Sequence, residues 1–194
     1  MKNAIKIFLG VAIIATAIIG YRNSLEYTYE LTFLSNSICG LVLLLDGTLY
    51  CIFKKNIPII IYQMVLLCTN VVFFTCIFSL LGWHSFNLNG AFFFLHAINP
   101  PLFMVIFMFF TKLKIKDKTD YIKRIFISPL LIIGYIIFDF IRYFITGRLV
   151  YGLVNTESLT AVSVPLIGIG FYLLMAFMSY GLIDLKLYIQ KKIS

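Results

Sequence analysis

The chain has 194 residues, of which 61% are hydrophobic and only 12% are charged. Soluble domains are roughly half apolar and about a quarter charged, so this composition excludes an ordinary soluble domain and indicates an integral membrane protein. The net charge is +8. It does not point to nucleic acid as a partner, because most basic residues gather in short stretches at the ends of long apolar segments.

Six apolar segments follow one another along the chain, at residues 4–21, 30–53, 57–82, 90–111, 125–147 and 159–186. A helix needs about 20 apolar residues to cross a bilayer, and each segment is close to or above that length. We therefore predict an all-α fold. Residues 1–194 would form a single domain, a polytopic membrane bundle of six transmembrane helices.

The distribution of lysine and arginine predicts the orientation of this bundle. If the N-terminus is cytoplasmic, the outer side receives only Arg22, Arg142 and Arg148, and the other thirteen of the sixteen basic residues fall on the inner side. The positive-inside rule therefore favours both termini in the cytoplasm, in a bacterial inner membrane. The basic stretch KLKIKDKTDYIKR (112–124) could contact anionic lipid head groups, but a topology signal is the favoured interpretation.

The first segment has an alternative interpretation. The stretch MKNAIKIFLGVAIIATAIIG has a basic start, an apolar run and an ATA triplet, as a secretory signal peptide does. The triplet lies inside the apolar run rather than after it, which favours a membrane helix. Cleavage there would leave five helices.

Three of the predicted helices carry polar residues in their outer halves. At about 1.5 Å of rise per residue, all of these residues fall in one layer of the bilayer. Residues spaced three or four apart share a helix face, so each helix presents its polar groups together. The three sets are Thr32, Ser35 and Asn36; His96 and Asn99; and Asp139 and Arg142. Polar groups at this depth are expected to face the bundle interior and to pair with one another.

A hydroxyl, an imidazole and an amide at matched depth suggest nucleophilic catalysis. The hydroxyl of Thr32 is a poor nucleophile until a base removes its proton, and neutral His96 would be that base. Asn36 or Asn99 could donate to the developing oxyanion. Ser35 would support the same helix face.

The competing interpretation of His96 is structural. Pro100 and Pro101 lack N–H groups and leave carbonyls of the preceding turn without donors. The imidazole could simply hydrogen-bond one of those carbonyls.

The charged residues in the predicted spans have several possible roles. Asp139 and Arg142 would form an ion pair, or Arg142 would hold a carboxylate ligand in bidentate fashion. Asp46 lies in the inner half of its helix and would hydrogen-bond Gln63 or Asn70 of the next helix. A proton or ion pathway through Asp46 is the alternative.

No metal or cofactor is expected from the sequence. A haem would need axial ligands, and the spans hold a single histidine. A retinal Schiff base would need a lysine near the middle of a span. The four cysteines form no CxxC pair, so they predict neither a zinc site nor a disulfide framework.

Three stretches resemble a known family. LTFLSN (31–36), HAINP (96–100) and DFIRYFITG (139–147), the last followed by Tyr151, are similar to motifs of the androgen-induced-gene family of six-helix membrane proteins and its bacterial relatives. The likeness spans roughly residues 28 to 186.

The resemblance implies a six-helix fold with cytoplasmic ends, in which Thr32 is the nucleophile and His96 the catalytic histidine. The animal members of the family act as threonine hydrolases on fatty acid esters of hydroxy fatty acids. One feature departs from the pattern. Bacterial relatives often carry an acidic residue after the proline of helix four, and MVIFMFF (104–110) has none.

The leading hypothesis is a membrane-embedded lipid-ester hydrolase that acts in the outer half of the bilayer on a lipid or fatty-acyl ester. The first alternative is a non-enzymatic lipid-binding or assembly protein whose polar layer only locks helix packing. The second is a small proton-coupled transporter using Asp46 and Asp139. The sequence shows none of the inverted repeats typical of that class. All three leave the oligomeric state open.

Overall fold

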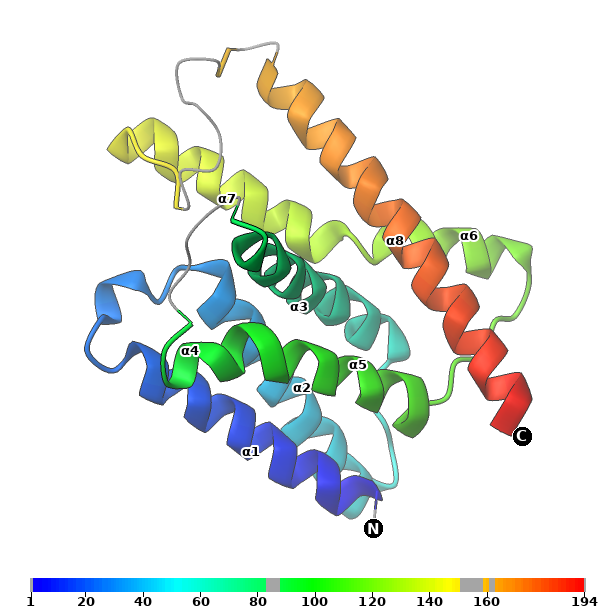
Figure 1. Ribbon diagram of the computed structural model, residues 1–194. Helices are drawn as coiled ribbons and strands as arrows, with labels where there is room; N and C mark the ends of the chain where they lie inside the picture. Colours follow the sequence, from blue (N-terminus) through cyan, green and yellow to red (C-terminus); the bar gives the residue numbers. More distant parts are fainter. Residues whose placement is uncertain (1, 83–87, 151–158, 161–162, 194) are drawn as a thin grey trace.

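The computed structural model describes residues 2–82, 88–150, 159–160 and 163–193, and over these residues the chain is helical, without strands (Figure 1). The helices are α1 (Lys2–Tyr21), α2 (Leu31–Phe53), α3 (Ile59–Leu80), α4 (Ala91–Phe93), α5 (Asn99–Phe110), α6 (Lys118–Ile127), α7 (Leu130–Thr146) and α8 (Ser163–Ile193). A short 3₁₀ turn, Leu25–Tyr27, follows α1, and a π-helical turn, Phe94–Ile98, joins α4 to α5.

Six helical runs are long and apolar enough to cross a membrane, which confirms the six predicted spans. They are Lys2–Tyr21, Leu31–Phe53, Ile59–Phe78, Ala91–Phe110, Lys118–Thr146 and Ser163–Ile193. Both termini lie towards the same end of the molecule, together with the α2–α3 and α5–α6 connections (Figure 1).

The predicted boundaries of the last two spans need correction. The helix of the fifth span begins at Lys118 rather than at residue 125. Asp117 caps it there by accepting a hydrogen bond from the Asp120 amide at 2.8 Å. The same span breaks between α6 and α7, where Pro129 precedes Leu130. The last helix continues to Ile193, beyond the predicted end at residue 186.

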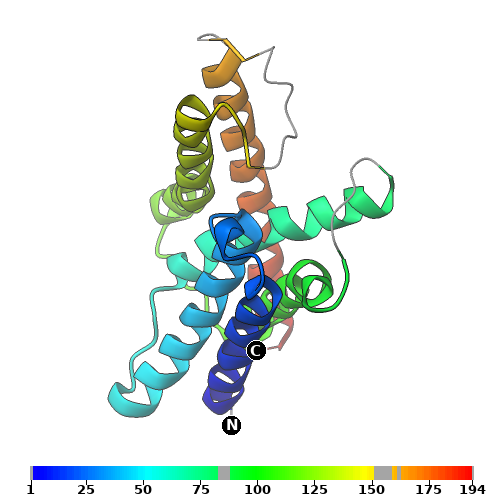
Figure 2. The same ribbon diagram turned by 90° about the vertical axis from the view of Figure 1, so that its left-hand side faces the viewer.

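The main core lies where α1, α2, α3 and α5 meet. It contains Ile13, Leu43, Leu66 and Phe107, all of them almost completely buried. α7 and α8 pack on the other side of α3, as both views show (Figures 1 and 2). A smaller cluster of Ala17, Tyr21 and Leu95, with Phe33 and Phe92 packed against it, joins the C-terminal half of α1 and the N-terminal half of α2 to the π turn. The candidate site lies beside this smaller cluster.

Candidate functional site

Thr32 and His96 face each other in the interior of the bundle. Thr32 is in the first turn of α2, and His96 is in the π turn before α5. The Thr32 hydroxyl oxygen is 3.1 Å from His96 Nε2. The two residues are 3% and 4% exposed, so the hydroxyl and the ring meet away from the surface of the molecule.

The other ring nitrogen fixes the tautomer of His96. Nδ1 is 2.9 Å from the carbonyl oxygen of Phe92, and a carbonyl can only accept a hydrogen bond. Nδ1 therefore carries a proton. In the neutral ring, Nε2 is then unprotonated and can accept a hydrogen bond from the Thr32 hydroxyl. This is the arrangement of a nucleophile, a base and a group that orients the base.

The two prolines explain the π turn that carries His96. The amide of Asn99 donates to the Phe94 carbonyl five residues earlier, rather than to Leu95 four residues earlier. The next residue, Pro100, has no N–H to offer. The Leu95 carbonyl thus loses its helical donors.

Asn36 supplies the missing donor. Its Nδ2 donates to the Leu95 carbonyl at 3.1 Å and to the Thr32 carbonyl at 2.8 Å. The structural interpretation expected His96 to hydrogen-bond a carbonyl freed by the prolines. Asn36 makes that hydrogen bond, to the Leu95 carbonyl. The ring of His96 bonds Phe92 and Thr32 instead.

A second amide extends the polar layer to α1. Asn99 Nδ2 donates to Asn36 Oδ1 at 2.9 Å and to the Thr16 hydroxyl at 3.1 Å, and Thr16 donates in turn to the Ile13 carbonyl. Each amide nitrogen thus has two acceptors within the protein. Their predicted oxyanion role stays a prediction, and it requires one of these bonds to open.

Ser35 has the supporting place that its helix face predicts. Its hydroxyl is 3.4 Å from the Thr32 carbonyl, one turn back along α2, and it is 2% exposed. This hydroxyl and the Asn36 amide converge on the same carbonyl oxygen. Together they hold the first turn of α2.

The predicted ion pair between Asp139 and Arg142 is wrong. Within the described part of the chain, the ion pairs are Lys6–Asp46 and Arg124–Asp120. Asp139 accepts a hydrogen bond from the Val150 amide at 2.9 Å instead. The two side chains share a helix face and bond separate backbone groups of the same short segment, residues 148–150.

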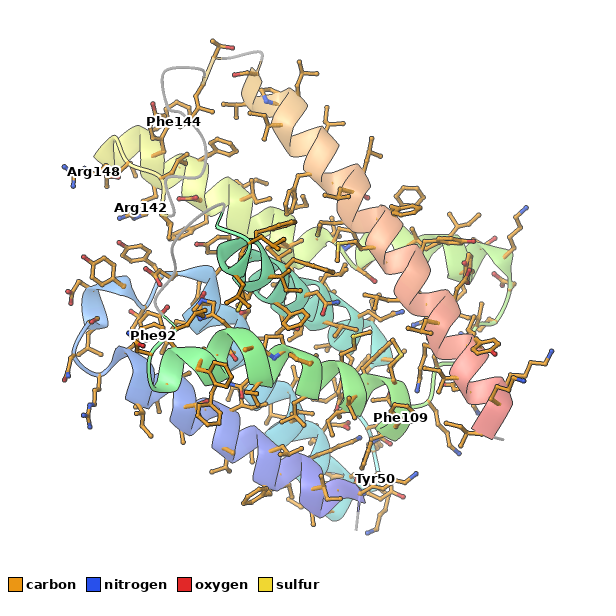
Figure 3. The ribbon with its side chains drawn as sticks, viewed as in Figure 1. Tyr50, Phe92, Phe109, Arg142, Phe144 and Arg148 are labelled. Carbon is orange, nitrogen blue, oxygen red and sulfur yellow. The ribbon has the colours of Figure 1, made fainter. Side chains whose placement is uncertain are left out.

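Arg142 lies over the start of α2. Its guanidinium stacks on the Tyr29 ring, 4.1 Å from the ring centroid, donates to the Tyr29 hydroxyl at 2.9 Å and reaches the Arg148 carbonyl at 3.2 Å. Figure 3 shows Arg142 and Arg148 together at the C-terminal end of α7. Arg142 thus contacts Tyr29, which precedes Thr32 by three positions in the sequence. Tyr151, part of the resemblance, lies outside the described residues.

Sequence reasoning missed three groups that build this site. The Tyr135 hydroxyl accepts a hydrogen bond from the Leu31 amide, which attaches α7 to the first turn of α2. The Tyr21 hydroxyl donates to Glu30, and partial burial raises the pKa of that carboxyl while this hydrogen bond opposes the rise. Thr16 is the third. The depth argument could have found Thr16, because it lies five residues before the C-terminal end of α1.

The predicted partners of Asp46 are also wrong. Asp46 is 1% exposed and pairs with Lys6 of α1 at 2.6 Å. It also accepts from the Tyr62 hydroxyl at 2.8 Å and from the Ile57 amide at 2.6 Å. Gln63, which we expected beside it, has neither amide atom hydrogen-bonded. A buried acid needs a cation more than an amide, and Lys6 lies at the matching depth.

No family model matches the chain, and neither a curated protein nor a solved structure matches it. The family resemblance of the sequence motifs therefore stays a prediction. Among the described residues, no group of three or more His, Cys, Asp or Glu side chains is placed to hold a metal ion.

Proposed function

We propose that the protein is a lipid-ester hydrolase embedded in a bacterial inner membrane, with Thr32 as nucleophile and His96 as base. The observation that carries the proposal is the 3.1 Å approach of the Thr32 hydroxyl to His96 Nε2. A buried hydroxyl facing the lone pair of an oriented imidazole has the geometry that nucleophilic catalysis requires. The resemblance of the motifs around both residues points to the same chemistry.

In the first step, Nε2 of His96 takes the hydroxyl proton as Thr32 Oγ1 attacks the ester carbonyl carbon. The tetrahedral intermediate collapses when the bond to the alkoxy oxygen breaks, and the imidazolium returns its proton to that oxygen. An alcohol leaves, and the acyl group stays on Thr32. The Phe92 carbonyl, 2.9 Å from Nδ1, stabilises the imidazolium that forms in between.

In the second step, Nε2 takes a proton from water, and the resulting hydroxide attacks the acyl-threonine. The bond to Oγ1 breaks, and Thr32 recovers its proton from His96. A carboxylic acid is released, and the enzyme returns to its starting state. The proposed reaction uses no cofactor.

Charge stabilisation in this scheme comes from the amides and from Arg142. Asn36 or Asn99 would exchange one of its present acceptors for the oxyanion when the substrate carbonyl arrives. Arg142 would hold a free carboxylate of the substrate, since its planar guanidinium binds carboxylates in bidentate fashion. Its place above the start of α2 supports that role.

The proposed orientation puts both termini in the cytoplasm and the Thr32–His96 pair in the outer half of the bilayer. It follows from the excess of lysine and arginine at one end of the molecule. An acyl chain would reach the site from the hydrocarbon of the outer leaflet, with its ester carbonyl entering between α2 and the π turn.

The proposal is tested by hydrolysis of long-chain esters by the purified protein. Thr32→Ala and His96→Asn should each lower kcat/KM by about 10²–10⁴-fold, because base and nucleophile act as one unit. Thr32→Ser should retain activity. Ser35→Ala is the matched control, since it removes a buried hydroxyl of the same helix turn. Equal loss in the Ser35 and Thr32 variants would contradict the assignment.

One observation favours the non-enzymatic alternative, in which the polar layer only locks the helices. The amide nitrogens of Asn36 and Asn99 are fully used by acceptors in α1, α2 and the π turn. If the polar layer only fixes helix packing, Thr32→Ala should lower the thermal stability, and any loss of function should follow from that loss of stability. The hydrolase predicts lost activity in a variant that still folds.

A further inference from the structure

The linker between α5 and α6, residues 111–117 with the sequence TKLKIKD, has a regular surface pattern. We call it the basic strap. The residues at its two ends, Thr111 and Asp117, have extended backbone. Between them, burial alternates: the three lysines are exposed, Leu113 is 3% exposed, and Ile115 is partly buried. The exposed residues are Lys112, Lys114 and Lys116. In an extended chain, alternate residues share one face and are spaced by about 6.5 Å.

The C-terminal half of α8 holds the strap in place. The side-chain amide of Gln190 bonds both backbone groups of Leu113, accepting from its N–H at 2.7 Å and donating to its carbonyl at 2.9 Å. Lys186, itself 1% exposed, donates to the carbonyls of Thr111 at 2.7 Å and Met108 at 2.6 Å. These bonds end α5 and keep the strap against α8.

The N-terminal turn of α6 fixes the other end of the strap. The Lys116 amide donates to Asp120 at 3.1 Å. Asp120 also pairs with Arg124 at 3.0 Å, and Asp117 caps α6. The carboxylates nearest to the strap are therefore engaged by α6. Among the described residues, the three strap lysines form no ion pair.

The strap lies at the end of the molecule that also carries both chain termini (Figure 1). Exposed Lys54 and Lys55 lie at the end of α2, and exposed Lys191 and Lys192 lie at the end of α8. This end of a membrane-spanning bundle is at the level of lipid head groups. An exposed row of unpaired lysines there is complementary to phosphate groups.

We propose that the basic strap is a docking surface for the anionic head groups of phospholipids in the adjacent leaflet. Its three lysines are exposed at alternate positions, and the bonds from Gln190 and Lys186 order the strap backbone before any lipid arrives. Ordering in advance lowers the entropic cost of binding. The interaction is independent of the Thr32–His96 chemistry.

The competing explanation is that these lysines only direct membrane topology. A topology signal requires positive charge in a short loop and no particular backbone geometry. A docking surface requires both the charge and the extended backbone that Gln190 holds. Gln190 therefore separates the two explanations, because its removal leaves the net charge unchanged.

The test measures retained lipid by native mass spectrometry. Purified protein is taken from nanodiscs of phosphatidylcholine and phosphatidylglycerol, and the ratio of the two bound lipids is compared among variants. The triple variant Lys112→Gln, Lys114→Gln, Lys116→Gln should lose about tenfold or more of the enrichment in phosphatidylglycerol. The matched control Lys54→Gln, Lys55→Gln, Lys192→Gln removes the same charge from the same end and should lose about twofold or less.

Two results would overturn the proposal. One is an unchanged enrichment in the triple strap variant, and the other is an equal loss in the matched control. Gln190→Leu tests the geometry and should reduce enrichment towards that of the strap variant if the protein folds. If a folded Gln190→Leu protein keeps the full enrichment in phosphatidylglycerol, the ordered backbone of the strap does not contribute to lipid binding. The lysine variants change only exposed side chains, so they decide the outcome even if Gln190→Leu does not fold.

Discussion

The Thr32–His96 pair brings a hydroxyl and an imidazole together in the interior of the bundle. In the neutral tautomer with its proton on Nδ1, both ring nitrogens are hydrogen-bonded. A neutral, satisfied imidazole is far less costly in hydrocarbon than an imidazolium. In the proposed reaction the ring would become charged only transiently, with the Phe92 carbonyl already in place to stabilise it.

Gln63 shows the opposite situation, because it is a buried amide with neither atom hydrogen-bonded. It faces a narrow gap between α3 and α8 that is lined also by Ser179 and by aliphatic side chains such as Leu66 and Ile183. An unsatisfied buried amide destabilises the folded state. We expect Gln63→Leu to stabilise the protein by about 1–2 kcal/mol, measured as a higher thermal unfolding midpoint in detergent.

The same substitution at Gln190 is the control. Gln190→Leu removes two satisfied hydrogen bonds to Leu113 and should lower the unfolding midpoint. A lower unfolding midpoint in the Gln63→Leu variant would contradict the view that the Gln63 amide is unsatisfied. It would indicate that Gln63 has a hydrogen-bond partner in the membrane.

The sequence predicts a contact between site residues where two polar residues lie at the same level along their predicted helices. Thr32 and His96 fall in one layer by residue count, and they do make contact. The partner of Asp46 was not predictable, because Lys6 lies in the basic flank of α1 by sequence position and yet is 2% exposed. A side chain as long as that of lysine can reach inwards from a helix end, and sequence position alone does not tell its direction.

The π turn before α5 is the element that brings the site together. Two prolines remove successive amide donors and the helix widens by one residue; of the carbonyls that this frees, that of Leu95 accepts from Asn36. Sequence reasoning expected prolines to free carbonyls. It could not tell which carbonyl would be freed, because that depends on whether the turn closes with α- or π-type hydrogen bonds.

The contact between α1 and α2 depends on glycine. A Cβ on Gly40 would lie 2.6 Å from the Ile14 side chain and 2.8 Å from the Gly10 carbonyl. Gly40→Ala should therefore push the helices apart and cost about 1–3 kcal/mol in the free energy of unfolding. Chemical denaturation in detergent measures this cost.

Gly134 in α7 provides the matched control, since a Cβ there meets nothing within 4 Å. Gly134→Ala should be neutral or stabilising by up to about 1 kcal/mol, as expected for alanine within a helix. Similar effects of the two substitutions would show that close approach of α1 and α2 is not what Gly40 provides.

The buried Lys6–Asp46 pair joins α1 to α2 at the other end of the molecule from the candidate site. Lys6→Met leaves Asp46 without its cation and should destabilise the protein by about 3–5 kcal/mol. Adding Asp46→Asn to that variant should recover most of the loss, because the Ile57 and Tyr62 donors still find an oxygen. A double-mutant cycle of unfolding free energies measures the coupling.

Additive losses in that cycle would contradict the ion pair as the source of stability. They would also reopen a proton pathway through Asp46, the transporter interpretation. Strong coupling supports a structural role, in which Asp46 and Lys6 join two helices and do not conduct a proton.

The whole molecule has basic residues concentrated at one end, and this predicts its sidedness. In a Cys51→Ala background, the remaining cysteines are buried. A Glu26→Cys variant should then react with a membrane-impermeant maleimide in intact bacterial cells, and a Lys55→Cys variant should react only after lysis. Both native residues are exposed, so accessibility does not bias the comparison. The reverse pattern would invert the orientation and place the candidate site in the inner leaflet.

The number of spans and their order were predictable from hydropathy, because length and apolar composition set them. The angle and neighbours of each span were not. α7 and α8 pack across α3 from α1 and α2 (Figure 2), and α8 reaches the α5–α6 linker through Lys186 and Gln190. Such contacts depend on which face of each helix finds a partner, and an almost uniformly apolar helix such as α3 carries little information about its faces.

The most direct test of the account is to locate a covalent adduct on the protein. The purified protein, treated with a long-chain fluorophosphonate, is digested and analysed by peptide mass spectrometry. The account predicts a phosphonyl adduct on Thr32 that disappears in the His96→Asn variant. An adduct on a different residue, or one on Thr32 that forms equally fast without His96, would contradict the proposed catalytic pair.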